Sequence, residues 1–317
     1  MGALCWNQYT DWPSLLEAGK QADRVGFYSL WTWDHLYPIV GAEEGPMFEG
    51  YMTLAAWAMA TEKVRIGLMV GANPYRNPAL VAKMATALDH ISGGRAYLGI
   101  GSAWDESEAN AFGIDMGASP GERLRWLREA LPVMRAMLHG EAGTAAGPRY
   151  AMNGVRNDPV PLQKHMPLLV GGGGEKVTLR LAARYADANN ISFASGPETF
   201  ARKEAALRRH CEEVGRDHRE IERTLNTGPV LIRDTREEAI SELERVYRHN
   251  GGAEAWANRP ASSQPVGPPE HFAEVFEPFV RAGYRHIVFG LPAPYDEETM
   301  VRLVRDIKPL LEQIPSD

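Results

Sequence analysis

Cysteine is scarce in this sequence: Cys5 and Cys211 are the only two in 317 residues. Two thiols so far apart, without the spacing of metal ligands, predict neither a disulfide framework nor a zinc site, and they fit a reducing cytoplasmic compartment. Long apolar runs are also missing, since none approaches the roughly 18–20 residues of a membrane-spanning helix. The amino terminus enters an apolar segment without a basic region or cleavage site, so we expect a soluble protein that is not exported.

Basic residues are too few and too scattered for a polyanion-binding protein. The chain has 34 Lys and Arg against 41 Asp and Glu, a formal net charge of −7, and no Lys/Arg-rich tract. We therefore expect neither a nucleic acid nor a membrane surface as partner, but a small molecule. An apolar content of 44% in a chain of this length can bury a large core, in one barrel or in two smaller domains.

Short apolar segments alternate with amphipathic helical patterns along the whole chain. One such unit, Ile66–Gly113, would fit a Rossmann half-domain as well as a barrel. Eight strands that alternate with helices favour a single (β/α)8 TIM barrel over residues 1–317, with loop insertions at its C-terminal face. The predicted strands are Ala3–Asn7, Phe27–Trp31, Val64–Val70, Ala96–Gly101, Leu168–Gly171, Ala188–Ser192, Thr227–Ile232 and His286–Gly290. The predicted helices are Trp12–Val25, Met52–Thr61, Pro78–Ile91, Gly121–Leu138, Lys176–Tyr185, Glu198–Val214, Arg236–His249 with His271–Ala282, and Glu297–Leu311.

Two connections are longer than usual. Ser119–Pro167 combines a long helix with Gly- and Pro-rich coil, and Gly251–Pro269 contains four prolines and little apolar content. Long loops in compact domains are often lids or binding loops, and a plain surface excursion explains them as well. Both interpretations stay open at this point.

The run WTWDH at Trp31–His35 leaves the second predicted strand, where the active face of a barrel is expected. It places a carboxylate and an imidazole beside two indoles, which makes His35 the best candidate for acid–base chemistry. In the alternative interpretation Asp34 caps the next segment and His35 packs against the tryptophans.

Glycines mark a second candidate site, because Gly171–Gly174 follow an apolar strand and open a helix. Backbone N–H groups at such a joint can bind a phosphate, although four glycines also permit a simple tight turn. The loop has neither the GK[ST] ending of a Walker loop nor the continuation of a dinucleotide-binding motif. Further along, Asp187–Asn190 places polar side chains on the sixth strand, either for ligand contact or as satisfied buried amides.

Two other strand ends carry irregular or polar sequence. Leu68–Val70 runs into Gly71–Asn73, which suggests a bulge. Trp104 follows the fourth strand and would wall an aromatic ligand. The acidic residues after it could act in acid–base chemistry or bind a metal, but they also fit a helix start, and no His/carboxylate cluster has metal-site spacing, so we assign no metal. These acidic residues are Asp105, Glu106 and Glu108.

Taken together, these motifs resemble the luciferase-like (bacterial luciferase) superfamily, particularly its branch that uses the deazaflavin coenzyme F-420 (F420). The matching segments, in order, are Trp33–His35 (WDH), Tyr75–Trp104, Gly171–Asn190 and Val266–Gly290. The resemblance implies a TIM barrel with the cofactor ring at the carboxyl ends of the strands. The ring edge would lie near Asp34 and His35, with one face on the bulge, where members often have a non-prolyl cis peptide. The cofactor contacts implied in this way are Asp34, His35, Leu68, Met69, Val70, Ser107, Gly172, Gly173, Gly174 and Asn190.

One departure bears on the substrate. Relatives that oxidise sugar phosphates place a catalytic glutamate where this chain has Trp104, although Asp105 and Glu106 are adjacent. Trp33 and Trp104 would instead line a pocket for a flat or apolar substrate. The resemblance thus implies an F420-dependent reductase that transfers hydride, with His35 as proton donor or ring-polarising group. A homodimer is expected. The alternatives are an FMN-dependent two-component monooxygenase with a separate reductase, a flavin-binding protein without turnover, and, more remotely, a metal-dependent barrel isomerase or hydrolase.

Overall fold

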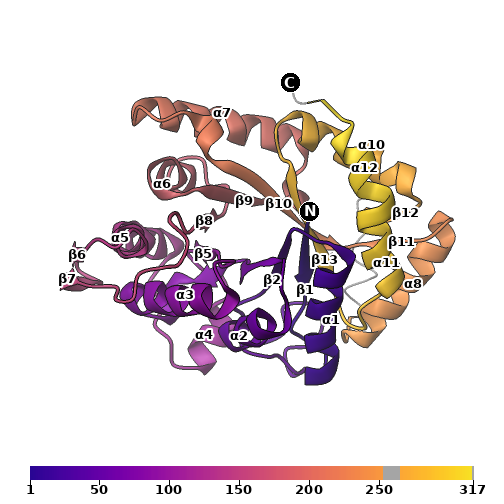
Figure 1. Cartoon of the computed structure of the whole chain (residues 1–317), viewed down its shortest axis with the longest axis horizontal. Helices are drawn as coiled ribbons and strands as arrows, with labels where there is room; N and C mark the ends of the chain where they lie inside the picture. The colour runs from indigo at the N-terminus through magenta and orange to yellow at the C-terminus, as the bar shows by residue number, and fades with distance from the viewer. Residues whose placement is uncertain (253–264, 316–317) are drawn as a thin grey trace. The chain divides into compact units, whose positions relative to one another are not determined.

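The computed structural model describes residues 1–252 and 265–315 (Figure 1). The chain divides into two compact units. The terminal unit comprises Met1–Val64, Ser192–Ala201 and Arg223–Asp317, and the middle unit comprises Arg65–Ile191 and Arg202–Glu222. Within the described ranges, no helix is long and apolar enough to cross a membrane. The organisation of residues 1–317 as a single domain stays a prediction.

Parallel strands form the core of the terminal unit, in the order β2-β1-β13-β10. Gly2 of β1 lies opposite Ser29 of β2 and Val288 of β13. Every residue of β1, β2 and β13 is buried, as expected for parallel strands that are covered on both faces. The strand bounds are β1 (Gly2–Cys5), β2 (Ser29–Thr32), β10 (Glu222–Pro229) and β13 (His286–Leu291).

The helices of the terminal unit begin and end where local sequence signals place them. Asp11 caps α1 by accepting a hydrogen bond from the Ser14 N–H, and Gly26 ends this helix with a positive φ of 93°. Thr235 and Glu238 form a capping box at the start of α8. The helix bounds are α1 (Trp12–Val25), α2 (Gly50–Ala60), α8 (Arg236–His249), α10 (Pro269–Arg281), α11 (Glu297–Arg302), the π-helical turn η5 (Leu303–Ile307) and α12 (Lys308–Glu312).

The middle unit repeats the βα pattern, with parallel strands in the order β9-β8-β5-β4. Its strands are β3 (Arg65–Leu68), β4 (Gly71–Ala72), β5 (Leu98–Gly101), β8 (Leu168–Gly171) and β9 (Ala188–Ser192). Its helices are α3 (Pro78–Ser92), α4 (Glu106–Ala111), α5 (Pro120–Leu138), α6 (Thr178–Tyr185) and most of α7 (Pro197–Glu213), with the short 3-10 turns η1 (Asn73–Tyr75) and η3 (His218–Glu220); η2 (Phe193–Ser195) belongs to the terminal unit.

The expectation of coil after the long helix of Ser119–Pro167 is wrong in part. This connection contains an antiparallel hairpin of β6 (Gly143–Ala146) and β7 (Ala151–Val155). Ala145, Met152 and Val155 of the hairpin pack against a buried cluster of Ala82, Val133 and Met137 on α3 and α5. The hairpin escaped prediction because GTAA and AMNGV are poor in β-branched and aromatic residues. In the other long connection, residues 253–264 lie outside the described residues, so its role as a lid is not tested.

The seventh strand was predicted over Thr227–Ile232, and the structure corrects this. The sheet strand is β10, which ends at Pro229 after a register shift that begins at Asn226. After Val230, Leu231–Ile232 form β11, which pairs with β12 (Val266–Gly267) outside the main sheet. Pro229 has no N–H to donate, and after Val230, whose N–H still donates to the Gly290 carbonyl at 3.2 Å, the chain leaves the main sheet although the apolar pattern continues.

Candidate active site

A bulge between β3 and β4 is the first feature of the candidate site in the middle unit. It contains a cis peptide bond between Met69 and Val70, as the family resemblance implied. Glycines make room for it: an ideal Cβ on Gly101 would lie 2.9 Å from Val70 Cγ2, and one on Gly171 only 2.6 Å from the same atom. A Cβ on Gly99 would lie 2.1 Å from the Leu68 carbonyl oxygen. These three positions, the glycine cradle, therefore let the bulge approach β5 and β8 closely.

The loop Gly171–Gly174 continues directly from the cradle. Gly172 adopts a positive φ of 112°, and its N–H donates to the Asn190 carbonyl at 2.8 Å. A Cβ on Gly174 would lie 2.9 Å from the Thr178 hydroxyl oxygen at the start of α6. Val177, the N-cap residue of α6, makes no side-chain cap hydrogen bond. The loop thus combines close backbone with a hydroxyl at a helix N-terminus, an arrangement that suits an anion.

Lys203 of α7 adds a cation to this loop, and the sequence patterns did not identify it. Its ammonium donates a hydrogen bond to the Gly173 carbonyl, and a Cβ on Gly173 would lie 2.8 Å from Lys203 Nζ. The neighbouring Arg202 instead pairs with Glu175 at 2.7 Å. A positive charge on this loop is what a phosphate ligand requires in addition to N–H donors.

The polar residues of Asp187–Asn190 have different partners in the structure. The Asn189 side chain donates to the carbonyls of Val170 and Gly172, at 2.8 and 3.1 Å, so it is a satisfied buried amide that holds the loop. Asp187 accepts from the Leu168 N–H at 2.9 Å and pairs with Arg135. Burial raises the pKa of Asp187, but this hydrogen bond and Arg135 together bring the pKa below its usual value. Contact between the Asn190 side chain and a cofactor stays a prediction.

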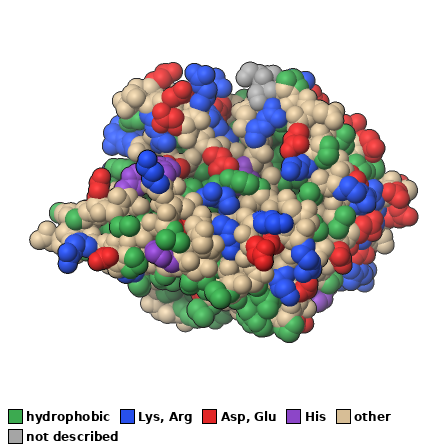
Figure 2. Space-filling view, in the orientation of Figure 1, with side chains coloured by type: hydrophobic (Ala, Val, Ile, Leu, Met, Phe, Trp, Pro, Cys, Tyr) green, Lys and Arg blue, Asp and Glu red, His purple; other side chains and the backbone are tan. Residues whose placement is uncertain are grey.

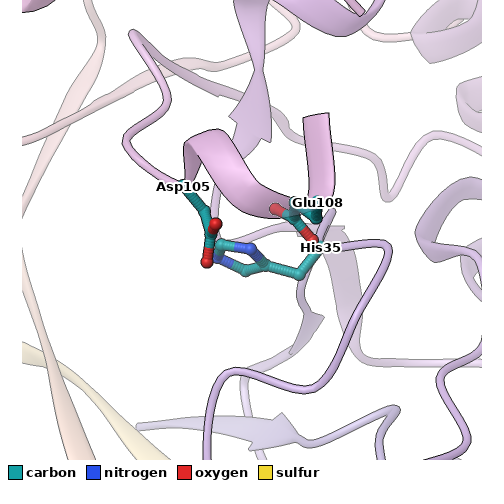
Figure 3. Close-up of side chains that lie close together, drawn as sticks. All are labelled: His35, Asp105 and Glu108. Atoms are coloured by element: carbon teal, nitrogen blue, oxygen red, sulfur yellow. The ribbon is translucent and has the colours of Figure 1, made fainter. Parts of the chain in front are cut away.

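The acidic residues after β5 have separate structural partners. Asp105 caps α4 by accepting from the Ser107 N–H at 3.0 Å, and Glu106 pairs with the buried Arg123 at 2.9 Å. The buried Glu108 accepts a 2.6 Å hydrogen bond from the hydroxyl of Tyr75, which ties α4 to the segment after the bulge. Figure 3 shows Asp105 and Glu108 at the start of α4.

The terminal unit contributes an aromatic row at the ends of β1 and β2. The Trp33 ring lies between two others: its centroid is 4.7 Å from that of Trp6 and 6.4 Å from that of His35, the latter edge-on at 87°. His35, drawn in Figure 3 on the segment after β2, therefore packs against tryptophan, as one interpretation expected. The buried Asp34 begins no helix, because α2 starts at Gly50 with Glu49 as its cap.

A family model described as luciferase-like monooxygenase matches residues 4–287. The chain belongs to this family. An F420-dependent glucose-6-phosphate dehydrogenase from Microbacterium testaceum is 28% identical over 311 residues, which cover 91% of this chain and 90% of that protein. A protein of the same name from Amycolatopsis mediterranei is 26% identical, with 95% of each chain covered.

Two solved structures have the same fold as this luciferase-like chain. An F420-dependent secondary alcohol dehydrogenase, in complex with an F420-acetone adduct, superposes with a TM-score of 0.82 at 21% identity, covering 98% of each chain. The F420-dependent tetrahydromethanopterin reductase of Methanopyrus kandleri gives 0.76 at 19% identity, again covering 98% of each chain. The likeness confirms the predicted (β/α)8 barrel. The cofactor and pocket roles of individual residues, including Ser107, Trp33 and the 62%-exposed Trp104, stay predictions.

Proposed function

We propose that this luciferase-like chain is an F420-dependent oxidoreductase that transfers a hydride between the deazaflavin and a small organic substrate, acting as a reductase. The relatives named above support the class of enzyme. The observation that carries the proposal is the adjacency, in the middle unit, of the bulge that the glycine cradle holds against β5 and β8 and the Gly171–Gly174 loop with the Lys203 ammonium beside it. When bound, the deazaflavin supplies the carbon that gives or accepts the hydride, and the protein supplies binding, orientation and a proton.

The phosphate of the cofactor would be held by three kinds of donor in the middle unit. These are the backbone N–H groups of Gly173 and Gly174, the Thr178 hydroxyl and the Lys203 ammonium, while the Gly172 N–H is used by the Asn190 carbonyl. Charge-assisted hydrogen bonds are roughly twice as strong as neutral ones, so Lys203 should make the largest single contribution. A neutral flavin without phosphate would lose these contacts.

His35 is proposed as the group that holds the proton next to the reacting atoms. Its ring meets the Trp33 ring edge-on, and this contact favours one orientation of the imidazole. A residue in this role lowers turnover when it is removed and leaves cofactor affinity largely unchanged.

Trp33 and Trp104 are proposed as pocket walls for a flat or apolar substrate. Indole rings offer apolar area and stacking rather than the charge-assisted contacts that a sugar phosphate requires. We therefore propose an unsaturated or nitroaromatic acceptor rather than glucose 6-phosphate, although relatives carry that substrate in their names.

The test is a parallel titration of the purified protein with F420, FMN and riboflavin, for the wild type, Lys203→Met and Arg202→Met. We expect tight binding of F420, no measurable binding of riboflavin, and an affinity loss in Lys203→Met that the matched Arg202→Met lacks. Oxidation of reduced F420 is then followed with an enone, a nitroarene and, in the reverse direction, glucose 6-phosphate. Preference for FMN would replace the proposal with a two-component monooxygenase. Binding of F420 without any turnover would indicate a flavin-binding protein.

A homodimer is proposed through α2. This helix carries no charged residue, and Met52 and Met59 are 71% and 77% exposed in the single chain. Figure 2 shows hydrophobic side chains along the lower edge, where Figure 1 places α2. With Ala55 and Ala56 between them at i+3 and i+4, the methionines form a seam that a second copy can cover by two-fold symmetry. Sedimentation should show a dimer that a Met52→Lys, Met59→Lys double variant converts to monomer.

A further inference from the structure

We infer that the indole N–H of Trp6 is a binding group for a carbonyl oxygen of the substrate. The inference rests on the proposed function and gives its substrate a chemical class: ketones, enones and related oxygen acceptors. Neither the motif analysis nor the family resemblance assigned a role to Trp6, which was expected inside the first strand. In the structure β1 ends at Cys5, so Trp6 stands just beyond the carboxyl end of the strand, where the ligand face of a (β/α)8 barrel lies.

Trp6 is buried, with 3% of its surface exposed, yet its Nε1 has no hydrogen-bond partner among the residues that the structure describes. Other buried tryptophans of the terminal unit are satisfied: Trp31 donates to the Ser29 hydroxyl at 2.7 Å, and Trp57 to the Leu15 carbonyl at 3.0 Å. A buried donor without an acceptor destabilises a fold, because it has lost its hydrogen bond to water and gained none in the protein. Native structures rarely contain a buried donor without an acceptor. A bound ligand that supplies the acceptor would explain the one at Trp6.

The side chain of Trp6 is fixed by its surroundings. Its backbone N–H donates to the Leu291 carbonyl at 3.1 Å, and its own carbonyl accepts from the Tyr295 hydroxyl at 2.7 Å. Its ring packs on Trp33 with the planes tilted by 36°. The indole is therefore held in place, as a preorganised binding group must be.

A second buried atom at the same strand end also lacks a partner. Asn7, fully buried, donates through its amide nitrogen to the carbonyls of Trp33 and Phe48, while its Oδ1 has no partner among the described residues. Two successive residues after β1 thus each carry an unsatisfied polar atom. The two atoms differ in kind: the Trp6 N–H is a donor that a carbonyl oxygen can accept from, whereas Asn7 Oδ1 is an acceptor and takes no part in binding that oxygen.

The aromatic row places the Trp6 N–H and the His35 imidazole on either side of one indole ring. Trp33 lies between Trp6 and His35, so the N–H donor and the proposed proton-holding imidazole flank the same indole. A carbonyl that accepts a hydrogen bond from Trp6 is oriented and loses electron density, which makes the substrate a better hydride acceptor. Substrates without an oxygen acceptor would leave the Trp6 N–H unsatisfied and bind less well.

The test uses the full chain saturated with oxidised F420, labelled with 15N in its indole groups, and two probes: cyclohex-2-en-1-one and its oxygen-free analogue cyclohexene. The signal that disappears in Trp6→Phe identifies the Trp6 N–H. We expect this signal to shift saturably with the ketone and not with cyclohexene, while the Trp57 signal stays in place. An unmoved Trp6 signal, or equal shifts with both probes, would overturn the inference.

Steady-state kinetics with reduced F420 and the same ketone give the second readout. Trp6→Phe should raise the KM about tenfold, the factor that corresponds to one hydrogen bond of about 1.4 kcal/mol, with F420 affinity unchanged. The matched control Trp12→Phe replaces a tryptophan on α1 and should change neither value. If F420 binds and the ketone is reduced with equal KM by wild type and Trp6→Phe, the inference fails and the proposed function stands. If F420 does not bind, the proposed function fails, and the spectra of the cofactor-free chain decide on Trp6 alone.

Discussion

Replacement of Gly171 by alanine is the most direct test of the glycine cradle. The new Cβ would lie 2.6 Å from Val70 Cγ2 and 3.0 Å from Val70 Cγ1. Valine is β-branched and has little freedom at χ1, so it cannot rotate away without strain. Overpacking of this kind destabilises the folded protein by about 1–3 kcal/mol. Alanine also lowers the conformational entropy of the unfolded chain, which stabilises the folded protein by about 0.4–1 kcal/mol. We therefore expect Gly171→Ala to lower the free energy of unfolding by about 1–2 kcal/mol.

Urea unfolding of four proteins measures this effect: wild type, Gly171→Ala, Val70→Ala and the double variant. In the Val70→Ala background the clashing methyl groups are absent, so Gly171→Ala should become nearly neutral. Gly228→Ala is the matched control, because a Cβ on Gly228 meets nothing within 4 Å. It should leave stability unchanged or raise it slightly.

The reasoning is refuted if the two substitutions are additive. Independent sites add within about 0.3–0.5 kcal/mol, so a coupling energy inside that range would mean that Val70 and Gly171 do not touch. A stable Gly171→Ala single variant would lead to the same conclusion.

Three further predictions concern Lys203 and Asp187 of the middle unit and His35 of the terminal unit. Lys203→Met should weaken F420 binding about tenfold at low salt, with a smaller effect at high salt, in a fluorescence titration; equal affinities would remove Lys203 from the phosphate site. His35→Ala should lower kcat at least about tenfold while the Kd for F420 changes less than about twofold, and the exposed His90→Ala, measured beside it, should change neither. Asp187→Asn should reduce the free energy of unfolding at pH 7. Burial raises the pKa of Asp187, but the Leu168 N–H and Arg135 lower it more, so the folded-state pKa lies below the unfolded value of about 3.9. The contribution of the ionised Asp187 to the free energy of unfolding is therefore complete above about pH 3.9 and is lost as the pH falls through the folded-state pKa. The free energies of unfolding of wild type and Asp187→Asn should converge in acid. A difference that stays constant from pH 7 to acid would contradict this.

Features of this fold that depend on local sequence could be predicted. The alternation of strands and helices, the loop at Gly171–Gly174 and the irregular exit after Leu68 all follow from glycine, proline and the period of apolar residues within short windows. The same signals failed where pairing decides the structure. Leu231 and Ile232 read as a continuation of the seventh strand, yet they pair with β12 instead.

Features that depend on distant residues were missed. Lys203 lies far along the chain from Gly173, and only the fold of α7 brings its ammonium to that carbonyl. Nothing in the motif around Trp6 distinguishes it from Trp31 or Trp57, because all three are buried indoles. The difference is the presence of an acceptor, which is a property of the neighbours in space.

The two units carry their proposed ligand-binding groups in different ways. In the middle unit the decisive feature is the lack of side chains: Gly99, Gly101 and Gly171 let the bulge pack directly against the backbone of β5 and β8. In the terminal unit it is the addition of large side chains, Trp6 and Trp33, next to an imidazole. A surface of backbone recognises the invariant parts of a cofactor, ring and phosphate, whereas side chains distinguish one substrate from another. Substitutions in the middle unit should therefore change which cofactor binds, and substitutions in the aromatic row should change which substrate is reduced.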